Sequence, residues 1–113
     1  MEIVTEKIPI AKLKEMTEKM FGNIVKTVVD VERGIMAIDG ELHADEQALL
    51  LENGSEQKNL WGINIYPDKI GEDFVEFDSV INIRPSQQNR TRGVDNPEIR
   101  QIILDIVNKL IEK

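Results

Sequence analysis

The C-terminal segment constrains the fold of this chain more than any other feature of its sequence. From residue 97 onward, aliphatic side chains recur at helical spacing and form one continuous apolar stripe: Ile99, Ile102, Ile103, Ile106, Val107, Leu110 and Ile111. Asp95 or Asn96 is expected to cap this helix, and Pro97 suits its first turn. Asp95 and Glu98 also have the spacing of a capping box. A helix with such a stripe must be covered by an apolar surface, and a sheet face can supply one.

Several segments have the composition or the alternation of β-strands, and these would form the sheet. The predicted strands are residues 2–8, 23–31, 35–38, 59–66 and 74–84. Residues 32–34 form a predicted tight turn, and the last two strands form a predicted hairpin. Alternation assigns one set of side chains to the core: Val25, Val29, Val31, Trp61, Ile63, Ile65, Val75, Phe77, Ser79, Ile81 and Ile83.

Two further segments complete the predicted fold. A second helix is expected over residues 10–21, where an apolar stripe ends at Gly22. Residues 45–53 suit two different structures. We favour a strand that runs into the Asn-Gly turn pair at 53–54. A short helix that begins at Asp45 and stops at that glycine is the alternative.

Together these elements predict an α+β protein, in which an antiparallel sheet of about five or six strands packs against two helices as a two-layer sandwich. The length suits a single domain over residues 1–113. The chain has no cysteine, which excludes disulfides, cysteine metal ligands and a cysteine nucleophile. Because it shows neither a secretory signal pattern nor an apolar run that could span a membrane, we expect a soluble, cytoplasmic protein without a membrane partner.

The loop over residues 84–93 has the clearest functional composition. It holds three of the five arginines of a chain whose net charge is −7, and it contains no acid. Arginine suits phosphate and carboxylate groups, and the loop leads into a helix N-terminus, which favours anions. The sequence therefore predicts that the loop binds an anionic small molecule through Arg84, Ser86, Gln87, Asn89, Arg90 and Arg92. The alternative is a surface loop whose arginines pair with the many acids of the chain. The net charge disfavours nucleic acid as a partner.

The polar face of the last two predicted strands leads into this loop. Strand alternation gathers one set of polar side chains there: Asn64, Tyr66, Asp78, Asn82 and Arg84. Asn64, Asp78 and Asn82 are predicted to form the floor of the ligand site. Arg90 and Arg92 would form its rim. A solvated sheet face without a function is the alternative.

His43 is the only histidine, and carboxylates lie two residues away on either side. If this segment is a strand, Glu41, His43 and Asp45 point to one side and could bind a divalent metal ion. His43 with Asp45 could also act as a catalytic base. No second histidine and no zinc pattern accompany them. A surface histidine that hydrogen-bonds near acids is the alternative.

Five short motifs also occur, in chain order Glu41-Leu42-His43-Ala44-Asp45, Gly54-Ser55, Leu60-Trp61-Gly62-Ile63-Asn64, Ile81-Asn82-Ile83-Arg84-Pro85-Ser86-Gln87 and Asn89-Arg90. With these motifs the chain resembles a small prokaryotic family of stand-alone proteins known only as a domain of unknown function. The resemblance implies a single domain. It implies no activity, so it transfers no catalytic role to any residue.

Three functions are consistent with the sequence. The first is a small-ligand domain that binds an anion through the arginine-rich loop. The second is a hydrolase-type enzyme that uses His43 with nearby carboxylates, which requires His43 to lie close to the loop. The third is a homodimeric interaction module, in which the strand over residues 23–31 lies at a sheet edge and pairs with its copy. The sequence identifies no cofactor.

Overall fold

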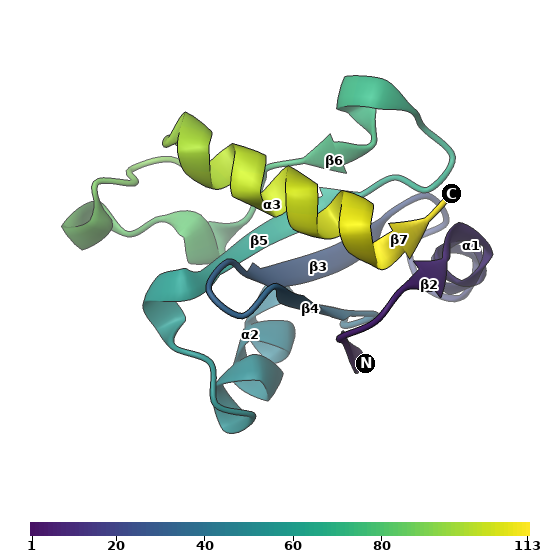
Figure 1. Cartoon of the computed structure of the whole chain (residues 1–113), viewed down its shortest axis with the longest axis horizontal. Coiled ribbons are helices and arrows are strands. Elements are labelled where there is room, and N and C mark those ends of the chain that lie inside the picture. Colours follow the sequence, from purple (N-terminus) through teal and green to yellow (C-terminus); the bar gives the residue numbers. More distant parts are fainter.

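The computed structural model describes residues 1–113 and has a five-stranded antiparallel sheet at its centre (Figure 1). The strand order is β1-β4-β3-β5-β6. The strands are β1 (Glu2–Val4), β3 (Val25–Asp30), β4 (Ile35–Ile38), β5 (Leu60–Ile65) and β6 (Val75–Glu76). The predicted α+β class with an antiparallel sheet is therefore confirmed.

β3 lies in the middle of this sheet. It pairs antiparallel with β4 on one side and with β5 on the other. Val25 and Val29 belong to the larger core, as the alternation predicts, whereas Val28 belongs to a second cluster on the opposite face. The predicted position of this strand at a sheet edge is wrong, because both of its edges are already hydrogen-bonded. β3 cannot pair with a second copy of the chain.

Two helices cover one face of the sheet and enclose the larger core (Figure 1). α3 (Pro97–Leu110) crosses the sheet and buries Val107, and α1 (Ile10–Lys19) buries Leu13 at one end of it. Trp61 faces the same core from β5. Both predicted helices are confirmed, and each forms because one stripe of aliphatic side chains is removed from water.

The ends of these helices follow from single residues. Asn96 is the N-cap of α3, and its Oδ1 accepts the Glu98 N–H at 2.8 Å. Asp95 does not form the predicted capping box, because its carboxylate binds the preceding loop instead. Gly22 ends the first helical segment with a positive φ of 83°, and its N–H donates to Thr17 O at 2.6 Å.

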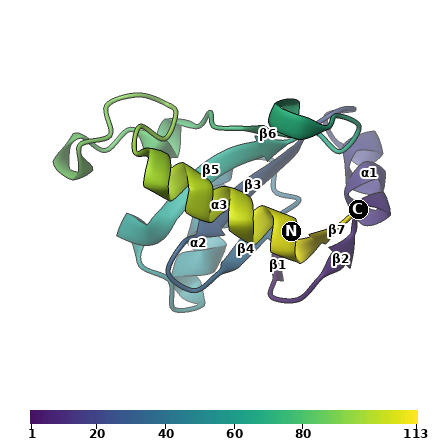
Figure 2. The ribbon, with the colours of Figure 1, turned by 45° about the horizontal axis from the view of Figure 1, so that its top comes forward.

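The segments beside the two helices form a second, two-stranded sheet. β2 (Ile8–Pro9) and β7 (Ile111–Glu112) pair in parallel, and Figure 2 shows them side by side near the C-terminus. The predicted strand over residues 2–8 is therefore divided, since only its first part belongs to the central sheet. The pairing holds the residues after α3 against those that precede α1.

A third helix, α2 (His43–Glu52), covers the opposite face of the sheet. The favoured strand over residues 45–53 is wrong, and the helical alternative is confirmed. Glu46 and Leu50, one turn apart, are both fully buried against the sheet, so helical spacing decides which residues pack. Because of α2, the sheet lies between helices on both faces rather than forming one of two layers (Figure 2).

The predicted long strand over residues 74–84 is also wrong. Only β6 pairs with β5, after which the chain turns through the short 3-10 helices η3 (Val80–Asn82) and η4 (Pro85–Gln87). Gly62 allows the chain to pass close to β5 here, since a Cβ there would lie 2.5 Å from the Cβ of Ser79. Beyond β6 the chain thus follows β5 through short 3-10 turns and not as a strand. One consequence is that Ile83, predicted to face the core, is 43% exposed.

Two further 3-10 helices, η1 (Gln57–Asn59) and η2 (Gly71–Asp73), precede β5 and β6. None of the helices has the length and the apolar character that a membrane-spanning segment needs.

Candidate functional site

The arginine-rich loop is a closed and internally bonded structure. Arg84 and Asn89 form an antiparallel bridge, in which Arg84 N–H donates to Asn89 O at 2.7 Å. Gln88 turns the loop with a positive φ of 61°. The Asn89 side chain is buried. Its Nδ2 donates to Asn82 O at 2.7 Å and to Gly93 O at 2.8 Å. Its Oδ1 accepts the Asp95 N–H at 2.8 Å. Asn89 therefore shapes the loop and has no free polar atom for a ligand.

Arg84 points into the protein. Its guanidinium donates to the carbonyl oxygens of Gln57 and Leu60 and lies 4.2 Å from the centroid of the Trp61 ring. Burial lowers the pKa of Arg84, and its Nε is buried without a partner. These contacts occupy the side chain, so Arg84 anchors the start of the loop.

Asn82 is fully buried at the same edge of β5. Its Oδ1 accepts the Gly62 N–H at 2.8 Å, and its Nδ2 donates to Gly62 O at 2.9 Å and to Arg92 O at 2.9 Å. The amide thus makes the two hydrogen bonds that a neighbouring strand would make. Asn82 is not part of an open floor, but it fixes the backbone of Arg92.

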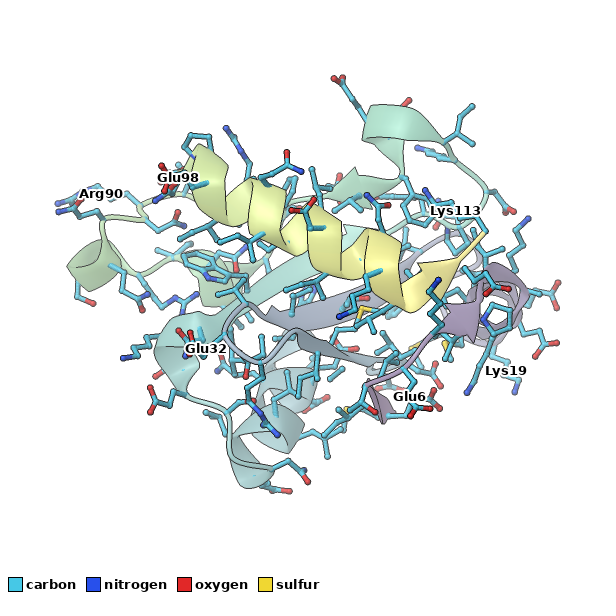
Figure 3. The ribbon with its side chains drawn as sticks, in the orientation of Figure 1. Glu6, Lys19, Glu32, Arg90, Glu98 and Lys113 are labelled. Carbon is cyan, nitrogen blue, oxygen red and sulfur yellow. The ribbon has the colours of Figure 1, made fainter.

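The outer residues of the loop are exposed. Figure 3 places Arg90 at the outer end of the loop, and its side chain makes no hydrogen bond or ion pair. Ser86 is exposed as well, and Gln87 Nε2 donates to Lys58 O at 3.0 Å. The backbone N–H of Arg90 donates to Asp95 Oδ2 at 3.1 Å. Arg90 is therefore held at its backbone and free at its guanidinium.

Residues from five segments lie near one another on the α2 side of the sheet, and we call them the His43 cluster. Its members are Lys26, His43, Asn64, Asp78 and Arg92. Arg92 Nε lies 2.6 Å from Asp78 Oδ1, and this contact raises the pKa of Arg92. Asn64 Nδ2 donates to Asp78 O at 3.3 Å. Four of the predicted site residues are thus brought together, namely His43, Asn64, Asp78 and Arg92.

His43 is the first residue of α2 and is partly buried. Its Nε2 lies 2.8 Å from Ile63 O. A carbonyl oxygen can only accept a hydrogen bond, so Nε2 carries the proton of the neutral ring and Nδ1 keeps its lone pair. Burial lowers the pKa of His43 below its ordinary value of 6.5, with a further contribution from the positive charges of Lys26 and Arg92. The ring is therefore neutral at pH 7, with Nδ1 available as an acceptor or a base.

The other predicted partners of His43 do not join it. The metal prediction required a strand, in which Glu41, His43 and Asp45 would point to one side, but α2 begins at His43. No group of three His, Asp or Glu residues could hold a metal ion. The carboxylate near His43 is that of Asp78, which comes from a different segment.

Asn64 is the most unusual member of the cluster. It is 7% exposed, and its Nδ2 donates to Glu76 Oε1 at 2.8 Å, which fixes the orientation of the amide. Its Oδ1 is buried and has no hydrogen-bond donor. A buried carbonyl oxygen without a donor is costly, so this atom marks a position where a donor from a ligand would be stabilising.

The sequence did not indicate a role for two side chains that are half-buried or buried in the structure, those of Lys26 and Glu46. Lys26 lies opposite Asn64 in the β3–β5 register, one position from the core residue Val25. The same alternation that assigned Val25 to the core could have placed Lys26 on the polar face. Glu46 gave no such indication, because its burial depends on α2. Its Oε2 accepts the Gly40 N–H at 2.9 Å, and burial raises its pKa to about 9.

The structure defines a small α+β protein with a polar cluster between a helix and the edge of an antiparallel sheet. The family model described as "Protein of unknown function (DUF5674)" matches residues 2–110. The chain belongs to this family, in agreement with the resemblance to a family of unknown function. No curated protein matches the chain, and no solved structure does.

Proposed function

We propose that the His43 cluster binds a small anion that carries a hydrogen-bond donor beside its charge. A hydroxy acid, an amino acid or hydrogen phosphate has this chemistry. The observation that carries the proposal is the buried and unpartnered Oδ1 of Asn64, which lies within the same cluster as two cationic side chains. The donor of the ligand would satisfy this oxygen, and the cations would hold its charge.

Arg92 is the principal anion ligand in this proposal. Its contact with Asp78 uses Nε, so its two Nη groups remain without a partner in the chain. They form the planar fork that binds a carboxylate or a phosphate in a bidentate manner. Asp78 holds the guanidinium in place. Lys26 supplies a second positive charge from β3, and the α2 N-terminus adds backbone N–H groups that no side chain caps.

This site would use Arg92, whereas a site at the loop tip would use Arg90. A thermal-shift and calorimetric screen would compare anions with and without an adjacent donor: glycolate against acetate, and phosphate against sulfate. A ligand at 100 times its Kd should add about 2.7 kcal/mol to the free energy of unfolding. We expect Arg92→Gln to abolish binding and the matched control Arg90→Gln to retain it.

The opposite pattern, with binding lost in Arg90→Gln and kept in Arg92→Gln, would place the anion at the loop tip. If no anion raises the melting temperature, or if acetate binds as well as glycolate, the role of Asn64 is refuted.

An acid–base enzyme that acts on the same ligand is a second candidate, favoured by the fixed tautomer of His43. The free Nδ1 could take a proton from the water that attacks an ester or phosphate ester held by Arg92, and return it to the alcohol that leaves. A turnover assay with esters and phosphate esters of the bound anion tests this. His43→Gln should then abolish turnover while the affinity for the ligand stays within about threefold. Equal turnover in the wild-type protein and in His43→Gln would exclude His43 as the base.

A further inference from the structure

A groove on the opposite side of the sheet is not used by the proposed site. It lies between α3 and residues 71–77 and has a volume of about 760 Å³. Sites for small organic ligands span about 300 to 1,000 Å³, so this groove is large enough to hold one. The His43 cluster lies on the α2 side, and the sheet separates the two.

The groove combines an apolar base with a cationic rim. Phe74, Phe77 and Leu104 supply apolar surface from both walls. Arg100 is exposed on α3, and its side chain makes no hydrogen bond or ion pair. Lys113 Nζ lies 3.9 Å from the centroid of the Phe74 ring, at the end of the groove where Figure 3 shows the C-terminal residue.

The charge of this rim contrasts with that of the whole chain. Two cations, Arg100 and Lys113, and one acid, Glu72, line the groove, whereas the protein carries a net charge of −7. Cationic side chains beside half-buried aromatic surface match a molecule with one anionic group on an apolar body. A purely apolar ligand would leave both cations unused, and an inorganic anion would leave the aromatic base unused.

We propose that this groove binds an amphipathic organic anion, such as an aryl or alkyl carboxylate or sulfonate. The apolar body lies on Phe77 and Leu104, and the anionic group faces Arg100, whose guanidinium offers a bidentate contact. Lys113 contributes a second charge from the other end of the groove. This site is independent of the anion site proposed for the His43 cluster.

Fluorescence of anilinonaphthalene sulfonate tests the proposal directly on the full chain. We expect saturable binding at one site, competition by octanoate, and amide shift changes in the NMR spectrum centred on Phe77 and Leu104. Arg100→Gln keeps the exposed α3 surface intact and should raise the Kd about tenfold or more, because a charge-assisted contact is lost. The neutral analogue phenylnaphthylamine should bind at least about tenfold more weakly than the sulfonate.

The matched controls separate this site from the other one. Arg90→Gln and Arg92→Gln should leave the Kd of the sulfonate unchanged. An unchanged Kd in Arg100→Gln, or equal affinity for the neutral analogue, would overturn the proposal and reduce the binding to unspecific apolar contact. Shift changes centred on residues outside the groove would overturn it as well.

Discussion

At the scale of single residues, composition identified the arginine-rich loop but not the structural role of each polar side chain in and beside it. Asn82 and Arg84 alternate with apolar residues, which is the pattern of a solvated strand face, and Asn89 lies in the polar loop that follows. In the structure their side chains instead bind backbone groups. A side-chain amide can replace the hydrogen bonds of a strand, and no alternation in the sequence distinguishes the two cases. By contrast, Asn64 lies where alternation predicted.

Glu46 makes stability depend on pH. Its pKa is about 9 in the folded protein and near 4.5 when exposed, so the folded state retains a proton that the unfolded state has lost. Its stabilising contribution is complete below about pH 4.5 and is lost as the pH rises toward 9, by up to about 1.4 kcal/mol per pH unit. We expect Glu46→Gln to remove this dependence, as measured by urea unfolding between pH 6 and 9.

The exposed Glu52, on the same helix, provides the control for this measurement. Glu52→Gln should follow the wild-type profile at every pH. Charged groups near Glu46, namely Lys26, Asp39 and the N-terminus, are present in all three proteins and do not affect the comparison. Parallel profiles for wild type and Glu46→Gln would show that Glu46 is ionised in the folded state.

At the scale of elements, a helix was predicted correctly where the periodicity of its apolar residues is strong. The stripe of α3 is long and continuous, and the helix forms where it was expected. The segment over residues 45–53 is short and rich in leucine, so both periods fit it equally. Packing then selects the helix, because only helical spacing buries Glu46 and Leu50 together. Such tertiary selection cannot be deduced from local propensity.

The N-terminus of α3 gives a prediction at this scale. Asn96→Ala removes the side chain that accepts the Glu98 N–H and should lower the free energy of unfolding by about 1 kcal/mol. Asp95→Ala instead releases the loop, because Asp95 binds Arg90 N and Thr91 Oγ1. Amide hydrogen exchange should therefore accelerate in the first turn of α3 in the Asn96 variant and at residue 90 in the Asp95 variant. Identical exchange patterns would contradict this division of roles.

At the scale of the whole molecule, the antiparallel α+β architecture was predictable and its layering was not. The third helix covers the second face of the sheet, and this face holds the His43 cluster. Sequence analysis identified His43, Asn64, Asp78 and Arg92 separately. Their proximity depends on how α2 and the chain after β6 cross the sheet. The close approach of Ser79 to Gly62 in the chain after β6 is likewise a property of the folded structure.

The way in which Asn82 and Arg84 cover the outer edge of β5 has a consequence for self-association. An uncovered strand edge is a template on which further chains can add, and this leads to aggregation. Here Asn82 occupies both backbone groups of Gly62, Arg84 occupies Leu60 O, and the Leu60 N–H donates to Gln57 O.

The substitution Asn82→Ala would expose the backbone hydrogen-bonding groups at the outer edge of β5. It leaves the buried backbone N–H and C=O of Gly62 without partners, so we expect the free energy of unfolding to fall by about 2 to 4 kcal/mol. We also expect light scattering to rise with protein concentration well below the melting temperature, whereas an equally destabilised Leu50→Ala variant, whose β5 edge is intact, should stay clear at the same temperature. The solubility of the protein during storage then rests on the amide of one buried asparagine.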